Sequence, residues 1–225
     1  KDKVDYIVTE LSLCQQARKT GYVGAIPNED SIFGKLANGI IKTGGFDMNG
    51  GWSPWYTVHK VMAGLLDAYM QCDNQQALQV LKGMADWTGN TLKNLSPEQL
   101  QKMLRCEWGG MNDLLANLYA VTAEKKYLDA ARRFSHRMLL DAMTAGKDNL
   151  DNKHANTQVP KAIGFARIGE LAKENNYTEA GAFFWQTVTT KRSLAFGGNS
   201  RREHFPSIAS CSDFVDDVEG PETCN

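Results

Sequence analysis

The chain has 225 residues, of which 25 are basic and 26 acidic, so its formal net charge is −1. This balance excludes a nucleic-acid binder that relies on bulk charge, because neutralising phosphates requires a basic excess. No apolar run approaches the roughly 20 residues that a membrane-spanning helix needs. The five cysteines are widely spaced and include no CxxC pair, so a disulfide framework is not expected either.

Apolar residues recur at i, i+3 and i+4 along most of the chain, whereas alternating β-branched runs are few. This spacing predicts amphipathic helices rather than strands. The expected helices centre, in chain order, on residues 4–14, 58–69, 77–87, 114–119, 127–134, 163–171 and 183–188. Ser96 followed by Pro97 predicts one more helix start, with serine as the N-cap and proline at the first helical position. We therefore predict an all-α fold in which helix packs on helix.

Equivalent apolar positions recur every 50 residues along the chain. The two series are 69, 119 and 169, and 77, 127 and 177. The repeat consists of spacing and apolar character rather than of identical residues. A helical-pair repeat of this size fits either an open α-solenoid or a closed ring of helical hairpins.

Polar and aromatic segments precede the first helix of each pair. They are residues 50–60, 107–113 and 154–161, and a fourth segment, 196–205, leads toward 222–225. Because positions 59, 109 and 159 are again 50 residues apart, we expect these segments to meet at one end of a helical stack. Tryptophan faces can stack on sugar rings, and Asn, His and Glu can bond to hydroxyls. This composition predicts a sugar-binding cleft.

Three carboxylate and thiol side chains could carry chemistry. Glu203 lies in a loop that follows a Gly-Gly turn, where a carboxylate beside a cleft can act as a general acid/base. A solvated glutamate paired with a neighbouring arginine explains the same spacing. Glu222 and Cys224 combine a hard carboxylate with a soft thiolate, which together suit zinc. The alternative is an ordinary loop, since two ligands do not make a metal site.

The histidines and tryptophans allow several interpretations. His59 opens a helix and is as compatible with a structural role as with ligand binding, whereas the polar surroundings of His154 favour function. Trp52 and Trp55 flank a proline and could form an exposed stacking platform or a packed turn. Other residues are expected in structural roles. His136 should lie on a solvated helix face, Trp87, Trp108 and Trp185 should pack in the interior, and Cys14, Cys72 and Cys106 should face the core.

Five motifs occur in order along the chain. They are WYTVHK with AGLLDAY (55–69), EWGGMND (107–113), HANTQVPK (154–161), GGNS with EHF (197–205) and ETCN (222–225). Together they resemble the β-L-arabinofuranosidase glycoside hydrolases of families 127 and 146. The forms of the second and fifth motifs are closer to the second of these families. The resemblance covers almost the whole chain.

The resemblance implies an (α/α)6 barrel, of which residues 1–225 would form a single partial catalytic domain. It implies a retaining hydrolase that releases β-L-arabinofuranose from plant-type glycans and uses a zinc-bound cysteine as nucleophile. Carried over by motif, Glu203 matches the general acid/base, and Glu222 and Cys224 match two zinc ligands. Zinc lowers the pKa of a thiol, so a nucleophile of this kind is ionised at neutral pH.

The same resemblance implies that His59 and His154 line the arabinose pocket, with Asn112 and Trp55 as further substrate-binding candidates. In the family the nucleophile belongs to a cysteine pair downstream of the fifth motif, so we expect it, and the rest of the barrel, beyond Asn225. This chain alone should therefore be inactive. We expect the parent protein to be periplasmic or secreted.

Other functions fit some of the same features. The rim of aromatic and polar residues also suits a non-catalytic carbohydrate-binding barrel, or a hydrolase that acts on another sugar. An α-solenoid interaction module is less favoured, because its recognition residues would follow a concave helix face. Here Gly, Trp, His and Asn concentrate between the helical pairs instead. Under the favoured hypotheses, the protein is expected to bind a carbohydrate and not a nucleic acid.

Overall fold

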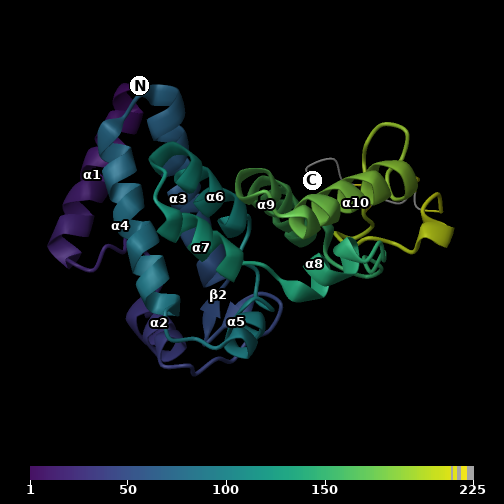
Figure 1. Ribbon diagram of the computed structural model, residues 1–225, viewed down its shortest axis with the longest axis horizontal. Helices are drawn as coiled ribbons and strands as arrows, with labels where there is room; N and C mark the ends of the chain where they lie inside the picture. Colours follow the sequence, from purple (N-terminus) through teal and green to yellow (C-terminus); the bar gives the residue numbers. More distant parts are fainter. Residues whose placement is uncertain (214, 217–218, 222–225) are drawn as a thin grey trace. The chain divides into compact units, whose positions relative to one another are not determined.

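The computed structural model describes residues 1–213, 215–216 and 219–221. In this part of the chain the backbone forms ten α-helices, one short 3-10 helix and one two-stranded sheet (Figure 1). The prediction of an all-α fold is confirmed. The chain divides into two compact units, Lys1–Phe134 and Ser135–Asn225. The arrangement of the whole chain as part of one barrel stays a prediction.

Unit 1 is built around a long central helix, α4. Its described helices are α1 (Asp2–Arg18), α2 (Glu29–Ala37), α3 (Pro54–Cys72), α4 (Gln75–Leu92), α5 (Pro97–Met103), α6 (Met111–Thr122) and α7 (Lys125–Arg133). A short antiparallel pair, β1 (Asp47–Met48) and β2 (Gly51–Trp52), precedes α3. Helix α4 packs against α1, α2, α3 and α7, so its apolar residues are covered by several neighbours. The helix start predicted at Ser96 is confirmed as a capping box with Gln99.

Unit 2 is a smaller helical bundle followed by an extended loop. It contains α8 (Arg137–Thr144), α9 (Ala155–Ala172), α10 (Asn175–Lys191) and the 3-10 helix η1 (Ile208–Ser210). Helix α10 packs along both α9 and α8. The loop between α10 and η1 carries the predicted acid/base, Glu203, and returns to the start of α9.

Three helical hairpins recur at intervals of 50 residues. In α3/α4, α6/α7 and α9/α10 the first helix ends at residue 72, 122 or 172, and the second begins at 75, 125 or 175. The residue after the first helix is left-handed each time, with φ of 55° at Asp73, 58° at Ala123 and 58° at Lys173. A left-handed residue ends a helix and redirects the chain at once. The repeat predicted from the sequence is therefore confirmed as a repeat of tight hairpins.

An aromatic cluster fills the centre of unit 1. Trp55 is 1% exposed, and its ring meets Phe33 and Phe134 edge-on at centroid distances of 4.9 and 5.4 Å. Trp87 lies 4.9 Å from Phe33, and Trp108 lies 5.8 Å from Phe134. Such pairs add roughly 0.5–1.5 kcal/mol beyond the area they bury. The cluster joins α2, α3, α4, α7 and the loop before α6 into one core.

Several expectations about individual elements and residues are wrong. The apolar spacing did not predict α2, α8 or the β1–β2 pair. Cys14 is exposed rather than core-facing, His136 is buried rather than solvated, and Trp185 is exposed rather than packed. Trp108 and Cys106 are buried as expected. Periodicity shows that a helix has an apolar stripe, but the neighbours decide whether that stripe is covered.

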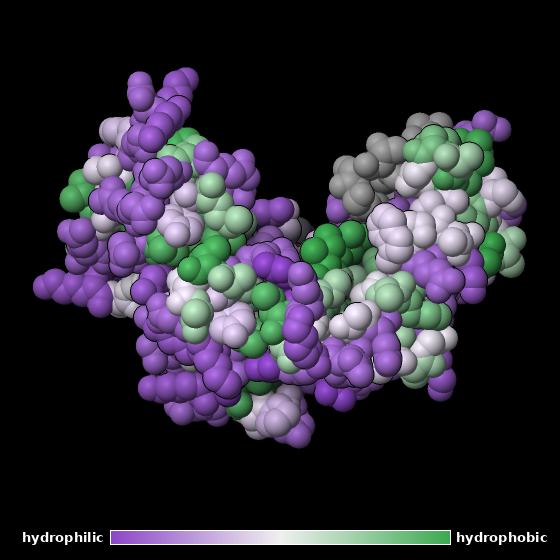
Figure 2. Space-filling view, turned by 45° about the horizontal axis from the view of Figure 1, so that its top comes forward, coloured by the Kyte–Doolittle hydropathy of each residue, from purple (hydrophilic) through white to green (hydrophobic). Residues whose placement is uncertain are grey.

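Apolar side chains remain at the surface of both units, as the green patches in Figure 2 show. On α1, Tyr6, Ile7 and Leu13 are each more than half exposed, and in unit 2 Trp185 and Phe196 are exposed as well. Exposed apolar patches are typical of surfaces that bind other molecules. Within the described residues, no helix combines the length and apolarity that crossing a bilayer requires.

Candidate active site

Glu203 and His154 lie side by side in unit 2. His154 is the N-cap of α9, and the backbone N–H of the next residue, Ala155, donates to the Glu203 carbonyl at 2.8 Å. The Phe205 N–H donates to the Lys153 carbonyl at 2.9 Å, so the two segments run antiparallel. The start of a helix and a loop about 50 residues later thus bring two predicted site residues together.

The side chains of this pair also approach each other. His154 Nε2 lies 3.5 Å from Glu203 Oε2, and the two side chains are 16% and 63% exposed, respectively. The His154 ring meets the His204 ring edge-on at a centroid distance of 5.2 Å. A carboxylate that touches an imidazole on one side and is open to solvent on the other can exchange a proton with a bound molecule.

The backbone around Glu203 is in an uncommon conformation. The φ angle is 63° at Glu203, 50° at Arg202 and 72° at Ser200, all in the left-handed region. This region costs a residue with a side chain on the order of 1 kcal/mol. The Arg202 guanidinium pairs with the Glu219 carboxylate at 2.6 Å, and the backbone N–H of Arg202 donates to the Glu219 carbonyl at 2.8 Å. Strain that the surrounding contacts hold in place is common at functional sites.

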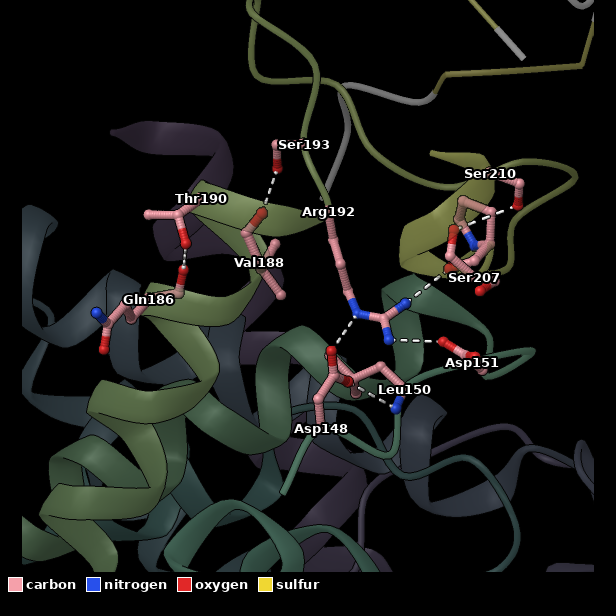
Figure 3. A network of polar contacts seen from close by, with 11 residues as sticks. Asp148, Leu150, Asp151, Gln186, Val188, Thr190, Arg192, Ser193, Ser207 and Ser210 are labelled. Carbon is pink, nitrogen blue, oxygen red and sulfur yellow. Dashed lines mark hydrogen bonds and ion pairs between the residues drawn. The ribbon is translucent and has the colours of Figure 1, made fainter. Parts of the chain in front are cut away.

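Arg192 ties together the loops next to this pair, as Figure 3 shows. Its guanidinium is buried and donates to Asp148 at 2.8 Å, to Asp151 at 2.6 Å and to the Pro206 carbonyl at 2.7 Å. Burial alone would lower the pKa of Arg192, but the hydrogen bonds to the two carboxylates outweigh it and raise that pKa. Because Pro206 lies three residues after Glu203, the network anchors the Glu203 loop. Arg192 was not a candidate from the sequence, because an arginine beside Lys191 at the end of a helix looks like a surface residue.

A pocket of about 420 Å³ lies in unit 2 beside the end of α10. Side chains from α9, α10 and the turn at 193–199 line it, among them Trp185, Thr189 and Asn199. Trp185 is 71% exposed, which leaves a ring face free. Aromatic surface, a hydroxyl and an amide are groups that suit a sugar ring. None of these residues was a candidate from the sequence, where Trp185 was expected to pack.

His59 lies in unit 1, in the second turn of α3, against the turn that precedes α6. A Cβ atom on Gly109 would lie 2.5 Å from His59 Nδ1, so the ring and the glycine backbone are in close contact. Nδ1 is buried and has no hydrogen-bond partner in the described part of the chain. Burial, with a smaller effect of Lys60, lowers the pKa of His59 to about 4. The imidazole is therefore neutral near pH 7, with one donor and one acceptor nitrogen.

Asn112 and Trp55, the other two substrate-binding candidates, lie inside unit 1. Asn112, in the first turn of α6, is 0% exposed, and Trp55 is enclosed by the aromatic cluster. The packed-turn interpretation therefore applies to Trp55. On the other side of the proline, Trp52 is 76% exposed and stacks on Phe46 at 5.5 Å between centroids. Of the two tryptophans, Trp52 is the one with surface to offer a ligand.

The predicted zinc ligands, Glu222 and Cys224, lie outside the described residues. Within residues 1–213, 215–216 and 219–221, no three His, Cys, Asp or Glu side chains are grouped closely enough to hold a metal ion. Zinc binding stays a prediction. His59 belongs to unit 1, and His154 and Glu203 belong to unit 2, so the convergence of all three on one cleft stays a prediction as well.

An all-α fold of repeated hairpins, with a carboxylate–imidazole pair at the start of one of them, is compatible with a helical glycoside hydrolase. A scan of protein-family models matches residues 1–225 to "Beta-L-arabinofuranosidase, GH127 catalytic domain". The chain belongs to this family and is a glycoside hydrolase of the arabinofuranosidase kind. Of the two families that the motifs resemble, the match is to the first. A search of curated proteins found no match.

Proposed function

We propose that the protein releases β-L-arabinofuranose from plant-type glycans with retention of configuration, and that Glu203 is the general acid/base. The observation that carries this proposal is the Glu203–His154 pair, 3.5 Å apart, in a chain of this family. Such glycans lie outside the cell, so we also propose that the parent protein is periplasmic or secreted.

Glu203 acts twice in the proposed reaction. First, its protonated carboxyl donates a proton to the glycosidic oxygen as the bond to the anomeric carbon breaks. Later, the resulting carboxylate accepts a proton from the water molecule that attacks the anomeric carbon. His154 orients the carboxyl group from the protein side through its Nε2, which lies 3.5 Å from Glu203 Oε2.

Zinc is the cofactor in this proposal. Glu222 and Cys224 would supply a carboxylate oxygen and a thiolate sulfur, both of which zinc accepts. When bound, the metal lowers the pKa of its thiol ligands. By resemblance, the nucleophile is a cysteine downstream of the fifth motif.

Hydrolysis of two arabinosides by the full-length protein tests the role of Glu203. Glu203→Gln should lower kcat/KM for an alkyl β-L-arabinofuranoside by about 10²–10⁴-fold, because the departing oxygen needs a proton. The loss should be smaller for the 4-nitrophenyl glycoside, whose leaving group departs without protonation.

Glu170→Gln is the matched control. Glu170 lies on α9 and its side chain is 65% exposed, similar to the 63% of Glu203, but it pairs with Arg167 on the same helix. This variant should keep wild-type rates. Wild-type turnover of the alkyl glycoside by Glu203→Gln would contradict the assigned role. Sugar binding by the wild type with no hydrolysis would indicate a non-catalytic carbohydrate-binding barrel instead.

A further inference from the structure

His59 and Gly109 are 50 residues apart in the sequence, yet the imidazole lies directly against the glycine backbone. Helix α3, which carries His59, packs on α6, and Gly109 is in the turn just before α6. A Cβ on Gly109 would lie 2.5 Å from Nδ1 and 3.2 Å from both Cγ and Cε1 of His59. Real Cβ atoms essentially never approach closer than 3.0 Å, so any other residue at 109 would push the ring away.

The turn that carries Gly109 is held in place by its own contacts. Gly109 has φ of 63°, which favours glycine, and its N–H donates to the Glu107 carboxylate at 2.7 Å. The Glu107 N–H in turn donates to the Gly45 carbonyl at 2.8 Å. Glu107 is 8% and Trp108 0% exposed. A turn that is buried and bonded at both ends cannot move aside to make room for a side chain.

We propose that residues 107–109 form a positioning turn that fixes the imidazole of His59 through direct contact with the Gly109 backbone. Glu107 and Gly109 are positioning residues in this proposal, since they act through His59. The contact keeps Nδ1 on the buried side of the ring and leaves Nε2 as the nitrogen for a ligand. The assignment of Nε2 to a ligand rests on the proposed function, in which His59 contacts the arabinose. The contact between His59 and Gly109 does not depend on that function.

Hydrogen–deuterium exchange at histidine Cε1, read by mass spectrometry across pH 3–8, tests the contact in the full-length protein. In the wild type, His59 should titrate at about 4 because it is buried. Gly109→Ala should move the ring toward water and shift this pKa toward the ordinary value of 6.5. An unchanged far-UV circular dichroism spectrum reports that the variant is folded.

Gly50→Ala is the matched control for backbone conformation. Gly50 also has a left-handed φ, of 88°, but a Cβ there would meet nothing within 4 Å. It should leave the pKa of His59 unchanged. An unchanged His59 pKa in Gly109→Ala would overturn the proposal.

A second measurement keeps the proposal testable if Gly109→Ala is too unstable for exchange. Gly109→Ala should lower the Tm by more than Gly50→Ala does. Both variants force alanine into a left-handed conformation, but only the Cβ at position 109 clashes with the His59 ring. The extra loss should disappear when His59→Ala removes the ring that the new Cβ meets. An equal loss of Tm in the presence and absence of His59 would overturn the positioning role.

Activity separates this inference from the proposed function. If His59 binds the sugar, Glu107→Ala should raise KM more than it lowers kcat. Glu107→Gln keeps an oxygen that accepts the Gly109 N–H and should retain the wild-type KM. A shifted His59 pKa in Gly109→Ala with no change of KM in Glu107→Ala would support the positioning turn and reject the substrate role of His59.

Discussion

At the scale of single residues, two buried basic side chains have pKa values shifted in opposite directions because only one of them has carboxylate partners. His59 has a buried nitrogen without a described partner, and its pKa is lowered to about 4. Arg192 is 2% exposed but has two carboxylate partners, which keep it charged. A buried charge is tolerated only when it is paired, so the imidazole stays neutral and the guanidinium stays ionised.

The neutral state of His59 makes stability depend on pH. The pKa is about 4 in the folded chain and about 6.5 in the unfolded chain. Between these values only the unfolded chain takes up the proton, so acid favours unfolding. The contribution of neutral His59 to the free energy of unfolding is fully present above pH 6.5 and is lost as the pH decreases toward 4. By pH 4.5 the loss should be roughly 2–3 kcal/mol, measured by urea unfolding at pH 7 and pH 4.5.

Two variants isolate this effect from other acid-sensitive groups. His59→Gln removes the titrating ring and should lose less stability between pH 7 and pH 4.5 than the wild type does. His204→Gln, at an exposed position, should follow the wild-type profile. If His59→Gln and the wild type lose the same free energy over this interval, the ring does not titrate as described.

At the scale of elements, the connector of each hairpin uses one left-handed residue. Asp73 tolerates this conformation well because its short polar side chain can bond locally. Ala123 and Lys173 have no such compensation, although their φ values are nearly the same. The same turn geometry therefore carries a different conformational free-energy cost in each hairpin. The packing of the paired helices must offset that cost.

Ala123→Gly should stabilise the chain. Relief of the left-handed conformation gains roughly 1–2 kcal/mol, and the added freedom of the unfolded chain costs roughly 0.4–1 kcal/mol. We expect the free energy of unfolding to rise by about 0.5–1 kcal/mol in denaturant unfolding. Ala120→Gly, at an exposed helical position of the same α6, should instead lower it by about 1 kcal/mol. A loss of stability in both variants would show that Ala123 is not strained.

At the scale of the whole molecule, the predicted site residues belong to both units and to a segment outside the described residues. Glu203 and His154 are paired within unit 2, His59 is fixed within unit 1, and Glu222 and Cys224 belong to the fifth motif. A site that combined all of them would require long-range assembly rather than one local motif. This is why metal content is a test of the full-length protein.

Cys224→Ser should lower the zinc content of the full-length protein. Loss of a direct ligand should weaken binding by at least the roughly 10–100-fold that loss of an outer-shell partner costs. Elemental analysis after dialysis against a weak chelator measures this, together with activity. Cys211→Ser, which changes a half-buried free cysteine nearby in the sequence, should keep its zinc. Full zinc content in Cys224→Ser would exclude this residue as a ligand.

The sequence by itself determined the helical class, the hairpin repeat and the family. Helical hydrogen bonds are local, so apolar spacing along α3, α4, α9 and α10 was enough to predict them. The 50-residue repeat and the order of the five motifs are also linear properties, which need no knowledge of packing. The sequence predicted that the segments carrying Glu203 and His154 reach the same end of the helical stack, but only the structure shows that the two residues pair.

Only the tertiary structure decided which side chains are covered and which are open. Trp55 is enclosed while Trp52 and Trp185 are exposed, although all three are tryptophans on or beside helices. His59 meets Gly109, and Arg192 meets two aspartates more than 40 residues away. Burial, and with it pKa and access to a ligand, depends on neighbours that are distant in sequence, and local periodicity carries no information about them.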